Sequence, residues 1–411
     1  MRTFAMLSLG WFAAACGRTT LDHVSVVDSG RDTATVADAV RIAVADSAAR
    51  PPDSGSCQWT FAPQVSYPAA WSPWSLAVGD FNGDGVPDVA ATSVDETYNS
   101  VAVWLNNGDG TFAPPVTYAL TSSSPYANSW TVAAGDFNGD HKLDFAVVGD
   151  TDSTGGILFG RGDGSFAPEV PFAISSAGAE GIAVDDLDGN GKPDLVVATG
   201  GQSVGVLLNP GDGSFSQEST YAAGGGAWTL ALADFNGDGH LDLAVAASPN
   251  GVSVLTNQGD GTFTPPVTFA LRSTNQVNVL VAGDFNDDGH PDLACTFFQS
   301  HGVAMWLNRG DGSFAPEVDY STGYWPTGIA VADFDGDGRT DLAVANSFVY
   351  DSGVSVLLNA GGGTFPTQVT YATGSCPNDI ATADFNRDDH PDLAVANTGD
   401  QTLGILLSVC R

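Results

Sequence analysis

The sequence predicts an all-β fold, namely a seven-bladed β-propeller in which every blade is a four-stranded sheet. A nine-residue acidic pattern recurs with successive offsets of 56, 50, 48, 50, 49 and 51 residues, starting at Asp80, Asp136, Asp186, Asp234, Asp284, Asp333 and Asp384. A period of about 50 residues is typical of propellers and solenoids. Short β-branched segments lie between the copies, and no segment keeps a 3.6-residue apolar period.

The N-terminal residues 1–15 are expected to be a signal peptide. Arg2 precedes an apolar run that is too short to span a bilayer, and three alanines then lead to Cys16. This junction resembles a bacterial lipoprotein cleavage site, which predicts an exported protein with a lipid on Cys16, anchored at the outer membrane or cell surface. The alternative is cleavage after Ala15 without a lipid, which gives a freely secreted protein.

Residues 16–56 are expected to form a flexible tether behind the lipidated cysteine. After Cys16 this stretch is rich in Ala, Asp, Ser, Thr and Val and contains no aromatic residue. Such a composition buries too little apolar surface to offset the entropy of ordering. The propeller itself is predicted to span residues 57–411.

Each repeat supplies the four strands of one blade. In the sixth repeat, an apolar segment at 328–333 leads into the acidic loop, and β-branched segments follow at 341–346, 353–359 and 364–371. Gly, Asn and Asp residues bound these segments, as expected for strands joined by hairpins.

The two ends of the chain are expected to complete one blade together. Residues 58–67 align with a fourth strand that has no first three, whereas the last unit, 384–409, has three strands and lacks its fourth. The N-terminal strand is therefore predicted to join the last blade and close the ring, which removes open sheet edges.

The cysteines fit this closure. Cys57 and Cys410 align with the same hairpin glycine of the first repeat, which predicts a Cys57–Cys410 disulfide in an exported protein. Cys295 lies in a predicted strand and is expected to be a buried free thiol. Cys376 lies in a predicted loop, and its state is left open.

The acidic loops have the composition of calcium sites. Oxygen-bearing side chains stand at positions one, three, five and nine, and glycine usually stands at position six. Ca²⁺ takes six to eight oxygen ligands, and a tight loop with alternating donors supplies several of them. Acidic turns that bind nothing are the alternative, but a turn alone does not require an acid at position nine.

The loops and the segments that follow them, such as Asp242 to Ala246, resemble the FG-GAP and VCBS-type repeats best known from the integrin α-subunit head. The resemblance covers 57–411 and implies a seven-bladed propeller that binds up to seven Ca²⁺ ions between the first and second strands of its blades. Carried over by position, it implies these ligands: Asp80, Asn82, Asp84, Asp88; Asp136, Asn138, Asp140, Asp144; Asp186, Asp188, Asn190, Asp194; Asp234, Asn236, Asp238, Asp242; Asp284, Asn286, Asp288, Asp292; Asp333, Asp335, Asp337, Asp341; Asp384, Asn386, Asp388, Asp392.

Departures from the pattern rank the sites. His141 and Asp389 replace the position-six glycine in the second and seventh loops, and Asn190 replaces an acid in the third. These three loops are expected to bind calcium most weakly. The sixth loop has four carboxylates and is expected to bind it most tightly.

Net charge restricts the partners. The chain carries 48 acidic and 13 basic residues, with a net charge of −35. It has no basic stripe, so nucleic acid is excluded as a partner, and a membrane is expected only through the lipid anchor. A monomer is expected.

A second candidate surface lies six residues before each acidic loop, in the connection between blades. The predicted ligand rim there comprises Trp74, Trp130, Glu180, Trp228 and Asn278, together with the nearby Trp325. Aromatic platforms with scattered polar groups suit sugars or protein side chains. The alternative is that these rings only pack between blades.

These observations favour a non-enzymatic, calcium-binding scaffold that recognises a glycan or an extracellular protein. No histidine, serine or cysteine outside the repeat pattern forms a catalytic set. The alternative function is a secreted polysaccharide-processing enzyme, lyase-like, because some such enzymes use related propellers.

Overall fold

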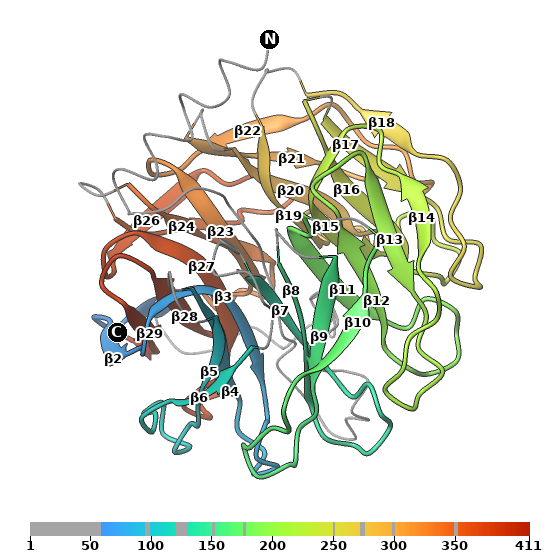
Figure 1. Cartoon of the computed structure of the whole chain (residues 1–411). Helices are drawn as coiled ribbons and strands as arrows, with labels where there is room; N and C mark the ends of the chain where they lie inside the picture. Colours follow the sequence, from blue (N-terminus) through green and yellow to red (C-terminus); the bar gives the residue numbers. More distant parts are fainter. Residues whose placement is uncertain are drawn as a thin grey trace, which may run out of the picture.

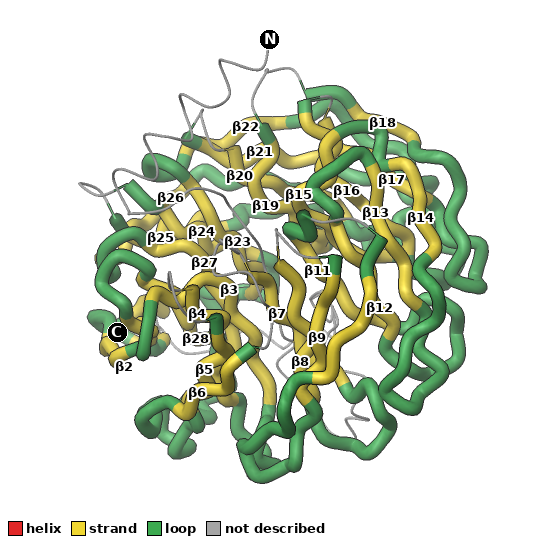
Figure 2. Tube along the Cα trace, viewed as in Figure 1, coloured by secondary structure: helices red, strands yellow, loops and turns green. Residues whose placement is uncertain are grey.

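The computed structural model describes residues 59–94, 99–120, 130–149, 153–175, 178–249, 251–271, 276–297, 301–348 and 352–411. Strands and loops make up this part of the chain, and it contains no helix (Figure 2). None of the described segments is therefore a helix long and apolar enough to cross a membrane.

Seven four-stranded antiparallel sheets are arranged around a central axis, so the predicted β-propeller is confirmed (Figure 1). The first three blades are β3 (Ser72–Gly79), β4 (Asp88–Val94), β5 (Ser100–Trp104), β6 (Val116–Ala119); β7 (Trp130–Gly135), β8 (Asp144–Gly149), β9 (Thr154–Leu158), β10 (Val170–Ala173); and β11 (Gly181–Asp185), β12 (Asp194–Ala198), β13 (Ser203–Leu207), β14 (Ser219–Ala222). The next three are β15 (Gly226–Ala233), β16 (Asp242–Ser248), β17 (Gly251–Leu255), β18 (Val267–Phe269); β19 (Val277–Gly283), β20 (Asp292–Phe297), β21 (Gly302–Trp306), β22 (Val318–Ser321); and β23 (Pro326–Ala332), β24 (Asp341–Asn346), β25 (Gly353–Leu358), β26 (Thr367–Ala372).

The seventh blade is built from both ends of the chain, as predicted. It contains β27 (Pro377–Ala383), β28 (Asp392–Asn397) and β29 (Thr402–Leu406), and β2 (Val65–Pro68) supplies its outer strand. Val65 pairs with Ile405 and Tyr67 with Leu403. A second small sheet pairs β1 (Trp59–Phe61) with β30 (Ser408–Cys410). The predicted strand at 58–67 is therefore two strands.

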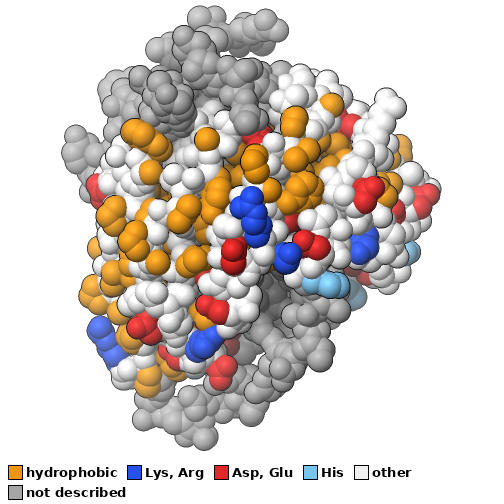
Figure 3. Space-filling view, turned by 60° about the horizontal axis from the view of Figure 1, so that its bottom comes forward, with side chains coloured by type: hydrophobic (Ala, Val, Ile, Leu, Met, Phe, Trp, Pro, Cys, Tyr) orange, Lys and Arg blue, Asp and Glu red, His pale blue; other side chains and the backbone are white. Residues whose placement is uncertain are grey.

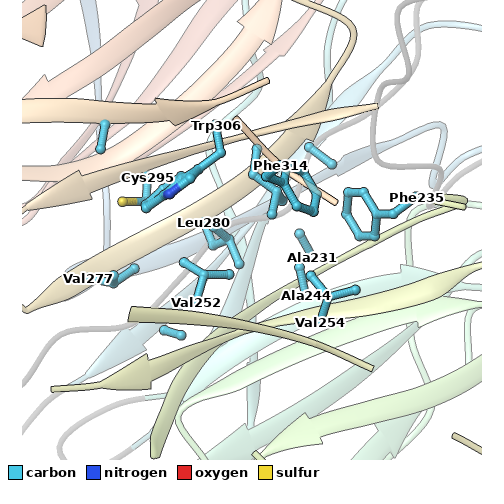
Figure 4. Close-up of a cluster of buried hydrophobic side chains, with 14 of the residues drawn as sticks. Ala231, Phe235, Ala244, Val252, Val254, Val277, Leu280, Cys295, Trp306 and Phe314 are labelled. Atoms are coloured by element: carbon cyan, nitrogen blue, oxygen red, sulfur yellow. The ribbon is translucent and has the colours of Figure 1, made fainter. Parts of the chain in front are cut away.

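The hydrophobic core lies between the blades. Each of the seven clusters of buried apolar side chains joins two neighbouring blades. Figure 4 shows the cluster between the fourth and fifth blades, where Phe235 and Val252 face Leu280, Trp306 and Phe314. Every blade thus buries both faces only when the ring is complete.

Polar groups of the innermost strands also link the blades. A β-bulge in β27, between Pro377 and Asp379, displaces the strand from its partner β28. The buried Asp379 carboxylate accepts the Leu76 N–H of the first blade at 2.8 Å and the Ile380 N–H at 2.9 Å. Burial raises the pKa of Asp379 to about 7. This carboxylate is a hydrogen-bonded bridge across the interface of the seventh and first blades.

The cysteines are only partly described. Cys295 is free and fully buried, as predicted. Cys376 and Cys410 are disulfide-bonded, but Cys57 lies outside the described residues, so the Cys57–Cys410 pairing stays a prediction. Cys16, the predicted signal peptide and the predicted tether also lie outside them.

Candidate metal centres

Each acidic loop connects the first and second strands of a blade. In the first loop, Asp80 Oδ1 accepts the N–H groups of Gly83 and Asp84 at 2.7 and 3.1 Å, and Oδ2 accepts that of Gly85 at 2.8 Å. Asn82 Oδ1 accepts the Asp84 N–H at 2.9 Å. Side-chain oxygens at positions one and three are therefore turned inward by the loop's own backbone.

The position-nine aspartate braces the loop against the blade. Asp88 is fully buried; one carboxylate oxygen accepts the Phe81 N–H at 3.0 Å, and the other accepts the Asn106 N–H at 2.8 Å. The same pair of bonds recurs at the other six position-nine residues, Asp144, Asp194, Asp242, Asp292, Asp341 and Asp392. This carboxylate thus joins the acidic loop to the turn between the third and fourth strands.

Burial perturbs the titration of these carboxyl groups. It is the largest cause that raises their pKa, and the other loop carboxylates add to it, while the N–H donors partly offset it. The pKa is raised to about 7 for Asp88, Asp144, Asp194, Asp292 and Asp392, to about 6 for Asp242 and to about 8 for Asp341. A bound cation would favour the ionised form at these positions.

In two loops the carboxylates converge enough to fit calcium. Oxygens of Asp186, Asp188 and Asp194 lie within 4.8 Å of one another, and so do those of Asp333, Asp335 and Asp341. Ligands at 2.3–2.6 Å from a Ca²⁺ ion are at most about 5 Å apart, so both groups match its coordination sphere. Each accepting oxygen retains a further lone pair for the ion.

The third loop converges through its position-three carboxylate. Its predicted weakness depended on Asn190 at position five, whose amide donates to the Asn209 carbonyl at 3.1 Å. The predicted order of calcium affinity among the loops stays a prediction.

Basic side chains contact acidic positions in two loops. Arg339 pairs with Asp337, and Lys142 Nζ lies 3.3 Å from Asp140 Oδ2. The few Lys and Arg side chains on the face in Figure 3 lie singly among acidic and uncharged groups. Arg339 already neutralises part of the charge that favoured the sixth loop, so Asp337 is expected to add less to calcium affinity than its carboxylate alone suggests.

An asparagine that was not predicted as a site residue links the acidic loops of neighbouring blades. Asn106 donates its amide to the Pro87 carbonyl of its own blade at 3.0 Å and to the Phe385 carbonyl of the seventh acidic loop at 2.8 Å. Equivalent bonds to the preceding blade are made by Asn209, Asn257, Asn308 and Asn359. The asparagine repeated after the third strand, preceded by leucine in four of these five blades, was the available signal. Gly160 and Ser408 occupy this place in the second and seventh blades.

Position six needs a left-handed backbone. Gly85 and its glycine equivalents have φ between 77° and 89°, whereas His141 and Asp389 hold the same conformation at 62° and 65°. A side chain in this region costs on the order of 1 kcal/mol. Both predicted departures are therefore tolerated by the fold at an energetic cost.

Replacing His141 by glycine is expected to stabilise the metal-free protein by about 1 kcal/mol, because the backbone strain is removed. Thermal unfolding in EGTA measures this. Gly85→His in the first loop is the matched control, since nothing lies within 4 Å of an added Cβ there and only the φ of 77° opposes it. It should destabilise by a similar amount, and equal melting temperatures for all three proteins would contradict the strain argument.

The predicted ligand rim is mostly buried between blades. Trp74, Glu180 and Asn278 are only 2%, 8% and 3% exposed. Asn278 donates its amide to the Pro326 carbonyl of the next blade at 2.8 Å, and Trp74 packs in the core between the first and second blades. For these three residues the structure favours the packing alternative.

The remaining rim residues differ in exposure. Trp228 and Trp325 are half-buried, and the Trp130 side chain lies outside the described part. Trp71 and Tyr324, at 41% and 50% exposure, present more aromatic surface on this side. The Tyr324 ring lies beside that of His301, with centroids 4.4 Å apart and the ring planes tilted by 59°. Any aromatic recognition surface is therefore smaller than predicted.

Seven blades, each with an acidic loop braced by a buried aspartate, define a class of repeat propeller with candidate calcium loops. An FG-GAP-like repeat model matches residues 53–91, 87–147, 143–197, 186–245, 234–295, 284–344 and 333–395. The chain therefore belongs to the FG-GAP-like repeat family, as the sequence resemblance indicated.

Solved structures support the same fold. BP39L lectin from Burkholderia pseudomallei aligns with a TM-score of 0.62 at 16% identity, over 83% of this chain and 96% of that one. An Agrocybe aegerita lectin that recognises non-reducing terminal N-acetylglucosamine aligns with a TM-score of 0.52 at 19% identity, over 86% of this chain and 85% of the lectin. BBS1N, solved in complex with ARL6DN, aligns with a TM-score of 0.56 at 14% identity, over 86% of this chain and 97% of BBS1N. No curated protein matches the chain significantly.

Proposed function

We propose that the protein is a calcium-stiffened, non-enzymatic propeller that binds a glycan. The observation that carries the calcium part is the convergence of three carboxylates in the third and sixth loops, within the span of one coordination sphere. There the loop aspartates would hold the ion, which supplies positive charge that offsets their mutual repulsion. The lectin neighbours support a glycan as the ligand, because they share this fold.

The proposal extends to location. We propose export through residues 1–15, with a lipid on Cys16, residues 16–56 as tether, and a monomeric propeller held at the bacterial outer membrane or cell surface. Free secretion is the alternative. Labelling of cells with radioactive palmitate, compared between the native chain and Cys16→Ser, distinguishes the two; equal labelling of both would rule out the lipid.

A glycan array screened in calcium and in EGTA tests the binding function. We expect glycan binding in calcium and its loss in EGTA. The position-nine aspartate of each acidic loop also holds the turn between the third and fourth strands, so an ion bound in the loop would order that turn as well. Binding to no glycan in calcium would overturn the proposal. In that case the structure solved with ARL6DN favours a protein ligand as the second candidate.

The lyase-like enzyme remains the rival from another class. Incubation of the purified chain with acidic polysaccharides separates the two, because a lyase leaves an unsaturated product that absorbs in the ultraviolet. Turnover in that assay would replace the binding proposal with an enzymatic one.

A further inference from the structure

The turn between β13 and β14 in the third blade lacks a hydrogen bond that other blades make. In five of them the second residue of this turn donates its N–H to a carbonyl four residues later, at 2.8–2.9 Å: Asn107 to Thr111, Arg161 to Ser165, Gln258 to Thr262, Arg309 to Ser313 and Ala360 to Thr364. Pro210 occupies this position in the third blade, and proline has no N–H. The turn therefore lacks this one bond, although at its base the Ser216 N–H donates to the Leu208 carbonyl at 2.8 Å.

The aromatic residue that follows the turn is also more exposed in the third blade than in the others. Phe215 is half-buried, whereas its equivalents are only 3–6% exposed: Phe112, Phe166, Phe263, Phe314 and Phe365. One side of the Phe215 ring still packs near Phe137 and Phe172, with ring centroids 5.8 and 5.4 Å away. The ring is thus held in place while part of it faces solvent.

A pocket of about 350 Å³ lies beside this ring. Leu208, Pro210 and Phe215 form its apolar wall, and Asp188, Asn190 and Ser216 supply polar groups. This volume is within the range of about 300–1,000 Å³ that small-ligand sites occupy. An apolar wall facing a few polar groups is the usual composition of such a site.

We propose that this pocket binds one pyranose ring of a glycan. The C–H face of the sugar packs on Phe215 and Leu208, and its hydroxyl groups bond to Asp188 and Asn190 on the acidic loop. A sugar suits the pocket better than a purely apolar ligand, because the Asp188 carboxylate and the Asn190 amide can bond to hydroxyl groups opposite the Phe215 ring. The inference rests on the proposed glycan-binding function and assigns it to a place in the third blade.

The site also explains why calcium and ligand binding would be coupled. Asp188 both lines the pocket and belongs to the converging carboxylates of the third loop. An ion held by that loop fixes the Asp188 side chain and hence the polar side of the pocket. Chelation is therefore expected to weaken sugar binding without any change at Phe215.

Saturation-transfer NMR and calorimetry with methyl β-N-acetylglucosaminide and methyl β-galactoside, in calcium, test the proposal. Phe215→Ala removes the stacking face, and Pro210→Asn restores the N–H that the first blade has in Asn107. Each is expected to weaken binding by about tenfold or more. Gln258→Asn, at the position equivalent to Pro210 in the fourth blade, is the matched control and should bind like the native chain.

The outcomes separate this site from the wider proposal. If the native chain binds a sugar and both variants bind it equally well, the pocket is overturned while glycan binding stands. If the native chain binds neither of these methyl glycosides nor any glycan on the array, both proposals fail. Pro210→Asn keeps every buried side chain, so it decides the question even if Phe215→Ala folds poorly.

Discussion

Removal of calcium by EGTA at about pH 7.5 is expected to lower the melting temperature of the propeller by roughly 10 °C or more. One site at a hundredfold excess of ion over its Kd adds about 2.7 kcal/mol to the free energy of unfolding, and several loops contribute. Each loop connects two strands of a blade, and its position-nine aspartate fixes a further turn. Calorimetry in calcium and in EGTA at equal ionic strength measures the shift.

The calcium effect is expected to grow as the pH rises. In the metal-free protein the position-nine carboxyls have pKa values of about 6 to 8, above the value of about 3.9 in the unfolded chain. The folded state therefore binds more protons between about pH 4 and 8. The contribution of these carboxyls to the stability of the metal-free protein is fully present below about pH 4 and is lost as the pH rises through their folded pKa values of about 6 to 8. Calcium must displace those protons, so its affinity increases over the same range.

Two results would contradict this account. One is a melting temperature in calcium that matches the value in EGTA at about pH 7.5, because calcium bound to the loops would then not stabilise the fold. The other is a calcium-induced shift that is larger at about pH 5 than at pH 7.5, because protonated carboxyls are poor ligands.

A chain that begins at Ala69, and so lacks β1 and β2, is expected to lose cooperative folding or to melt at least about 15 °C lower. It loses the pairing of β2 with β29 and leaves the edge of β29 open to association. It also loses Phe61, which is 5% exposed and packs edge-on against Phe334 and Tyr371 at the interface of the sixth and seventh blades. Calorimetry and light scattering measure both effects.

Point variants test the contribution of the N-terminal strands to stability in the full-length chain. Phe61→Ala should cost about 3–5 kcal/mol of unfolding free energy, because a buried ring is removed. Val65→Ser, on β2 itself, is the control and should cost little, since Val65 is 51% exposed. A shortened chain that melts within a few degrees of the full-length protein would show that the closing strand is dispensable.

Most of the fold followed from the spacing of the repeats. Strand segments, blade number and the closing strand were predictable, because a blade cannot bury its faces alone and an incomplete last blade needs the strand left over at the start. The division of 58–67 into β1 and β2 was not predictable, since it depends on how the two chain ends diverge. The β27 bulge and the Asp379 bridge were also missed, because the Leu76 N–H that Asp379 accepts belongs to the neighbouring blade.

The candidate site was predicted unevenly. Spacing identified the loop aspartates, because a local turn places them, whereas the carboxylate oxygens that come within 4.8 Å of one another are known only from the folded loop. Trp74 and Asn278 were read as a surface from their register, yet the neighbouring blade covers them. The Phe215 pocket was not anticipated, although Pro210 was visible, because its effect appears only when the turn is compared with those of other blades.

The sequence by itself determined the number of blades, the strand order, the closing strand and the acidic loops, because all of these are set by local pattern and by the need to close a ring. The tertiary structure alone decided which side chains face a neighbouring blade, which carboxylates converge and where a turn opens into a pocket. These features depend on how each loop folds and on contacts between segments of one blade or of neighbouring blades, and no local sequence pattern encodes them.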